Sequence, residues 1–89
     1  MKYNILYIDD EVANLNVFKA TFRRDYNIYT ANSATEGMGI LQTTPIDLVI
    51  TDQRMPKTTG VEFLKWCLAE YPNTMRIILT GFSDTEAII

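Results

Sequence analysis

IDLVITD, residues 46–52, is a nearly continuous apolar run that ends at Asp52. A strand with one face in water alternates apolar and polar residues, whereas a strand covered on both faces does not. Strands covered on both faces occur mainly in parallel sheets, where helices lie on each side. We therefore expect this run to form a central strand of such a sheet.

Further strand-like runs lie at residues 4–8, 26–30 and 75–79. The segments between the runs have apolar residues at helical spacing. The positions that mark these helices are Val12, Leu15, Phe18 and Phe22, then Ser33 and Glu36 in the pattern of a capping box, then Val61, Leu64, Leu68 and Tyr71 before Pro72. Another helix is expected to begin at Ser83. Repeated strand-helix units predict parallel strands, right-handed crossovers and a doubly wound α/β fold.

Length and composition are those of one globular domain. The chain has 89 residues, of which 47% are hydrophobic and 21% charged, so it should fold around a single core. Lys and Arg number 8 against 11 for Asp and Glu, and no basic cluster is present. Direct binding of nucleic acid is therefore not expected.

Cysteine and histidine content narrows the chemistry further. Cys67 is the only cysteine, so the chain has no internal disulfide and is compatible with a reducing compartment. The amino terminus resembles neither a signal peptide nor a membrane span, which favours a cytoplasmic location. Histidine is absent, so any chemistry must use carboxylates and hydroxyls.

Acids and a hydroxyl follow the ends of three expected strands. Asp9 and Asp10 follow the first, Asp52 ends the third and Thr80 follows the fourth. Because the carboxyl ends of parallel strands share one edge, we expect these side chains to lie close together. Three carboxylates at short range repel one another unless they bind a cation or become protonated. Oxygen ligands of this kind suit Mg²⁺ and, as the other candidate ion, Mn²⁺.

Each of these residues also has a structural interpretation. Asp9 and Asp10 can cap a helix that starts near Glu11. Thr80 alone is typical of a turn, and Gly60 is typical of a loop. The joint placement of the acids and the hydroxyl favours a functional site over these separate explanations.

Three segments resemble the receiver domains of response regulators in two-component phosphorelay signalling: YIDDE at residues 7–11, DQRMP at 52–56 with Gly60, and LTG at 79–81. The resemblance implies a flavodoxin-like sheet of strand order 2-1-3-4-5. It also implies that Asp52 accepts a phosphoryl group from a sensor histidine kinase or phosphotransfer protein.

The resemblance assigns the metal ligands as well. Asp10 and Asp52 would bind Mg²⁺ directly, Asp9 would help through water or as a further ligand, and Arg54 would supply its backbone carbonyl. Thr80 would hydrogen-bond a phosphoryl oxygen and so shift the domain toward an active form that a downstream output domain or protein detects.

The resemblance also assigns residues that flank the site. Gly81 would be small so that partners can reach the site. The side chains of Arg54 and Phe82 would tune how long the phosphoryl group survives.

The receiver domains that the chain resembles run to roughly 120 residues, and they end with a fifth strand, a fifth helix and a site lysine. We expect all three to be absent from residues 1–89, as in a carboxyl-terminally truncated domain. The strand at 75–79 would then be an exposed edge, which predicts self-association.

A phosphorylatable receiver is not the only function that the sequence allows. A receiver-like interaction module that acts without phosphorylation is the main alternative, because the lysine is missing. An aspartate-nucleophile phosphatase would need a second acid where Gln53-Arg54 stand, and a flavin site would be repelled by Asp9-Asp10-Glu11. We therefore do not expect an enzyme.

Overall fold

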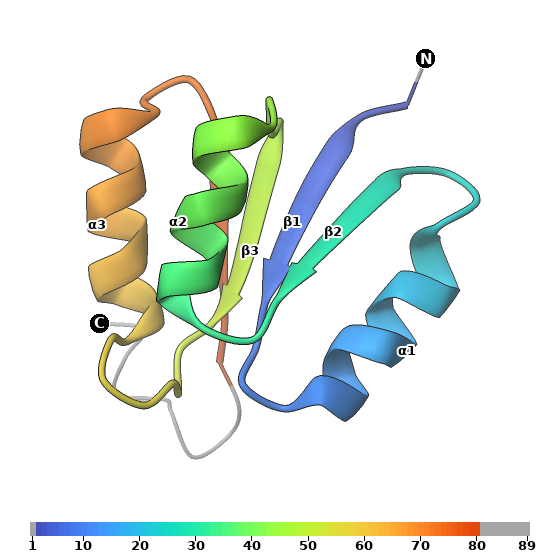
Figure 1. Ribbon diagram of the computed structural model, residues 1–89, viewed down its shortest axis with the longest axis horizontal. Coiled ribbons are helices and arrows are strands. Elements are labelled where there is room, and N and C mark those ends of the chain that lie inside the picture. The colour runs from blue at the N-terminus through green and yellow to red at the C-terminus, as the bar shows by residue number, and fades with distance from the viewer. Residues whose placement is uncertain (1, 81–89) are drawn as a thin grey trace.

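The computed structural model describes residues 2–80, and within them strands and helices alternate along the chain (Figure 1). The elements are β1 (Asn4–Ile8), α1 (Val12–Phe22), β2 (Asn27–Ala31), α2 (Ala34–Thr43), β3 (Leu48–Asp52), α3 (Gly60–Glu70) and β4 (Met75–Leu79). All described strands are parallel, in the order β2-β1-β3-β4. This confirms the predicted flavodoxin-like α/β order, with β3 between β1 and β4. The helix expected from Ser83 lies outside the described residues.

The main core lies between the sheet and the pair α2 and α3, which stand side by side in Figure 1. Leu6 and Val49 of the sheet and Phe63 and Cys67 of α3 are fully buried there. Burial raises the pKa of the Cys67 thiol to about 11, and the charge of Arg76 opposes this shift. Cys67 therefore packs in the core as a buried, protonated thiol.

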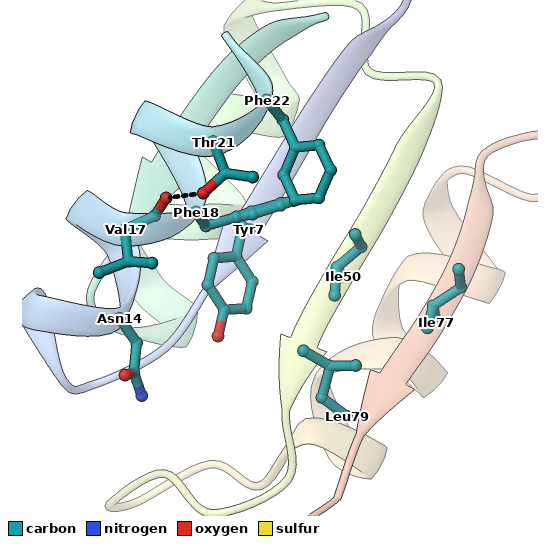
Figure 2. Close-up of a pocket in the computed structure, with 9 residues that line it drawn as sticks. All are labelled: Tyr7, Asn14, Val17, Phe18, Thr21, Phe22, Ile50, Ile77 and Leu79. Atoms are coloured by element: carbon teal, nitrogen blue, oxygen red, sulfur yellow. Dashed lines mark hydrogen bonds between the residues drawn. The ribbon is translucent and has the colours of Figure 1, made fainter.

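The opposite face of the sheet carries α1 among the described helices. Phe18 of α1 packs edge-on against Tyr7 of β1, with ring centroids 4.6 Å apart. Beside these rings, an open apolar groove of about 510 Å³ extends over β3 and β4 (Figure 2). Ile77 and Leu79 line the groove and are 43% and 45% exposed. β4 is the outer strand of the described sheet, in line with the edge position predicted for residues 75–79.

The buried residues of α3 differ from the apolar positions that mark this helix in the sequence. In α3, Leu68 is 53% exposed, and the buried residues are Gly60, Phe63 and Cys67. In α1, Leu15 is buried, whereas Phe22 lines the open groove and is 42% exposed. Apolar residues occur on several sides of α3, so periodicity alone left the rotation of this helix ambiguous.

None of the helices between residues 2 and 80 is long and apolar enough to cross a membrane.

Candidate metal centre at the carboxyl edge of the sheet

Parallel pairing brings the predicted acids together. Ile8 at the end of β1 pairs with Thr51 of β3, so Asp9 and Asp52 each lie one residue beyond this pair. One carboxylate oxygen from each of Asp9, Asp10 and Asp52 lies within 4.8 Å of the others. The sequence prediction that these three acids meet is therefore confirmed.

The three acids fit a divalent cation. Their ligand atoms are all carboxylate oxygens, the donors that Mg²⁺ and other hard ions prefer. Asp9 is buried, with 3% of its surface exposed, whereas Asp10 is exposed and Asp52 is half-buried. A cation can therefore approach from solvent toward a fixed inner carboxylate.

Hydrogen bonds hold Asp9 from several directions. Its Oδ2 atom accepts from the Tyr7 hydroxyl at 2.7 Å and from Asn14 Nδ2 at 3.0 Å, and its Oδ1 atom accepts from the Glu11 backbone N–H at 2.9 Å. Glu11 is the N-cap residue of α1 and its side chain makes no capping bond. Asp9 thus stabilises the entry into α1, in line with its structural interpretation, and it is also a member of the acid group.

The Tyr7 hydroxyl is held in its protonated form. Burial is the largest cause that raises its pKa above the ordinary value, followed by the hydrogen bond to Asp9 and by the negative charges of Asp9, Asp52 and Glu11. A protonated hydroxyl can donate to Asp9. Tyr7 was not predicted from the sequence as part of the site, although a residue two positions before a strand-end acid points to the same face.

The backbone around Asp52 is fixed by α3. The Gly60 N–H donates to the carbonyl of Gln53 at 3.1 Å, and the Val61 N–H donates to the Gln53 side chain at 3.0 Å. A Cβ atom at Gly60 would lie only 2.5 Å from the Asp52 carbonyl oxygen. The interpretation of Gly60 as an ordinary loop residue is therefore wrong, because the close approach of α3 to β3 requires a glycine.

For the remaining predicted site residues, the structure gives a position in the chain or in the sheet. Thr80 is half-buried and directly follows Leu79, the partner of Asp52 in the β3–β4 pair, so it lies at the same edge. Arg54 is exposed in the segment after Asp52. Gly81 and Phe82 lie outside the described residues. The specific roles of these four residues remain predictions.

Sequence comparison identifies relatives over nearly the whole chain. The family description "Response regulator receiver domain" matches residues 5–89. The hydrogenase transcriptional regulatory protein HoxA of Cupriavidus necator is 36% identical over 85 residues, which are 96% of this chain and 18% of that protein. The chain therefore spans about a fifth of the length of this curated relative.

Solved structures agree with this match. The signal receiver domain of an HD domain-containing protein from Pseudomonas fluorescens Pf-5 has a TM-score of 0.92 and 29% identity, covering 99% of this chain and 71% of that one. A response regulator receiver domain protein from Clostridium thermocellum has a TM-score of 0.87 and 38% identity, covering 96% and 70%. Together with the strand order and the acid group, these matches show that the chain belongs to the response regulator receiver domain family.

Proposed function

We propose that Asp52 accepts a phosphoryl group from the phosphohistidine of a sensor histidine kinase or phosphotransfer protein, in a Mg²⁺-dependent reaction. The observation that carries this proposal is the meeting of Asp52 with Asp9 and Asp10, whose oxygens lie within 4.8 Å of one another. Asp52 is half-buried, so a donor can still reach its carboxylate.

In the proposed transfer, a carboxylate oxygen of Asp52 forms a bond to phosphorus as the donor's P–N bond breaks. The imidazole nitrogen of the donor keeps the electron pair and gains a proton. Asp10, Asp52 and the Arg54 carbonyl would hold the cation, with Asp9 as a further ligand or through water. When bound, Mg²⁺, or Mn²⁺ in its place, supplies positive charge that reduces repulsion between the nucleophile and the phosphoryl oxygens.

The output of the proposed reaction is a change in protein contacts. Thr80, at the end of β4, would donate its hydroxyl to a phosphoryl oxygen and favour the conformation that a downstream output domain or protein binds. The side chains of Arg54 and Phe82, beside Gly81, would tune how long the phosphoryl group survives. The chain would act in the cytoplasm as a switch without an enzymatic reaction on other molecules.

The test is incubation of the chain with Mg²⁺ and acetyl phosphate, followed by intact mass measurement. We expect a mass gain of one phosphoryl group, which is lost in Asp52→Asn and on removal of Mg²⁺ by a chelator. Asp25→Asn is the matched control, because Asp25 is an exposed acid between α1 and β2, away from the acid group.

Absence of a mass gain in the unaltered chain would contradict the proposal and favour a receiver-like module that acts without phosphorylation. A gain that persists in Asp52→Asn would place the phosphoryl group on another residue.

A further inference from the structure

The hydrogen bonds of Asp9 leave its two carboxylate oxygens unequal. Oδ2 accepts from both Tyr7 and Asn14, at 2.7 and 3.0 Å, whereas Oδ1 accepts from the Glu11 backbone N–H at 2.9 Å. A carboxylate offers about four lone-pair positions, two on each oxygen. Within residues 2–80, both positions of Oδ2 are therefore in use, while Oδ1 retains one for another partner.

The two donors to Oδ2 come from different elements and are themselves held in place. Tyr7 belongs to β1, and its buried ring packs against Phe18. Asn14 belongs to the first turn of α1, where its backbone N–H donates to the Glu11 carbonyl at 3.0 Å. Figure 2 shows the Tyr7 hydroxyl and the Asn14 amide directed toward the same end of the groove. Binding of a second Asp9 oxygen to a cation would require one of these donors to move.

We propose that Tyr7 and Asn14 are positioning residues that determine cation specificity, because they restrict Asp9 to a single coordinating oxygen. Ca²⁺ takes about six to eight oxygen ligands and readily accepts both oxygens of one carboxylate, whereas Mg²⁺ takes an octahedral shell in which it keeps several waters. Blocking the two-oxygen mode therefore disfavours Ca²⁺ more than Mg²⁺. This inference rests on the metal site of the proposed function, with Asp9 as a direct ligand rather than one that acts through water.

The experiment is titration calorimetry of the chain with MgCl₂ and, separately, with CaCl₂. The variants are Tyr7→Phe, which keeps the ring beside Phe18, Asn14→Ala and the double variant. Loss of a partner of a ligating residue typically costs about 10–100-fold in metal affinity. If this loss falls mainly on Mg²⁺, the ratio of Mg²⁺ affinity to Ca²⁺ affinity should fall by roughly tenfold in Tyr7→Phe and further in the double variant. Tyr29→Phe in β2 is the matched control and should leave the ratio unchanged.

Thermal unfolding without metal shows whether each variant is folded. If Tyr7→Phe does not fold, Asn14→Ala carries the test, since Asn14 is an exposed residue of α1. Equal losses of affinity for both ions, or an unchanged ratio, would overturn the inference and leave the metal site intact. Failure of the unaltered chain to bind either ion would overturn the metal site and this inference together.

Discussion

Gly60 joins the start of α3 to the backbone of Asp52. A Cβ atom there would lie 2.5 Å from the Asp52 carbonyl oxygen and 3.0 Å from the Gln53 Cα atom. Both neighbours are backbone, so they cannot move aside as a flexible side chain would. A larger residue at position 60 would therefore displace both Asp52, the nucleophile of the proposed reaction, and the first turn of α3.

Gly60→Ala should lower the free energy of unfolding by about 1–3 kcal/mol, the usual cost of forcing an extra methyl group into a filled space. It should also slow phosphorylation by acetyl phosphate, because the end of β3 is displaced. Urea unfolding and the rate of mass gain measure the two effects.

Gly39→Ala is the control for Gly60→Ala. Gly39 lies within α2, and a Cβ atom there meets nothing within 4 Å. Alanine in a helix interior is more stable than glycine by about 0.5–1 kcal/mol, so this variant should be stabilised with an unchanged phosphorylation rate. Similar effects at both glycines would show that the close approach at Gly60 has no special role.

The acids of the site were predictable from sequence, whereas their supporting residues were not. Asp9, Asp10 and Asp52 follow from one rule, that the carboxyl ends of parallel strands share an edge. Tyr7 and Gly60 matter through distances that exist only once β1, α1, β3 and α3 are packed. A tyrosine in a strand and a glycine in a loop are both common without such roles.

At the scale of elements, the start of α3 is fixed by a capping box that was not predicted from the sequence. The Glu62 N–H donates to Thr59 Oγ1 at 3.2 Å, and the Thr59 N–H donates to Glu62 Oε1 at 2.9 Å. The box predicted at α2 is only half formed. Ser33 Oγ accepts from the Glu36 N–H, but the Glu36 side chain accepts from the Asn32 N–H instead.

The α3 capping box predicts a pH dependence of stability. The hydrogen bond from the Thr59 backbone, then the bond with its side chain and the charge of Lys65, lower the pKa of Glu62 below its ordinary value of 4.5. The folded state thus binds this proton more weakly than the unfolded state does. The resulting stabilisation is present above pH 4.5 and is lost as pH falls through the lowered pKa.

Urea unfolding of the unaltered chain and of Glu62→Gln, at neutral pH and at several acidic pH values, measures this effect. The difference in unfolding free energy between the two should be largest at neutral pH and should shrink on acidification. Repeating the pair in a Thr59→Ala background should reduce the pH-dependent part. A difference that grows as pH falls would contradict the assignment.

The order and type of the elements followed from the apolar patterns, because strands and helices differ in period. The rotation of α3 did not follow from them. Residues 61–68 of α3 include Val61, Phe63, Leu64, Trp66, Cys67 and Leu68, which surround most of the helix. Of these, Phe63 and Cys67 are fully buried in the core, whereas Leu68 is exposed.

At the scale of the whole molecule, the two faces of the sheet are covered unequally. α2 and α3 cover one face. On the other face, within residues 2–80, an open apolar groove lies over β3 and β4. β4 is also the outer strand of the described sheet, and its Met75, Ile77 and Leu79 are exposed. An outer strand with exposed apolar side chains favours pairing with another chain.

We therefore expect the 89-residue chain to self-associate with increasing concentration. Ile77→Lys should shift the population toward monomer, because a charge on an edge strand opposes pairing. Light scattering coupled to size-exclusion chromatography measures the mass of each species.

Leu68→Lys serves as the comparison for Ile77→Lys. Leu68 is also an exposed apolar residue, but it lies on α3 and does not line the groove. This variant should associate like the unaltered chain. A monomer at all concentrations, or equal effects of the two lysines, would rule out association through β4.

Because the strands are parallel, the acids of the site all lie at the carboxyl edge of the sheet and none of them lies at the amino-terminal edge. The turns that lead into the strands, such as the one at Pro72 and Asn73 before β4, lie at the end opposite Asp52. A five-residue strand is about 16 Å long, so a group attached there is well separated from the acids. A fluorescent dye or surface tether at Asn73 would thus offer a handle for biosensor construction that leaves the chemistry of the other edge undisturbed.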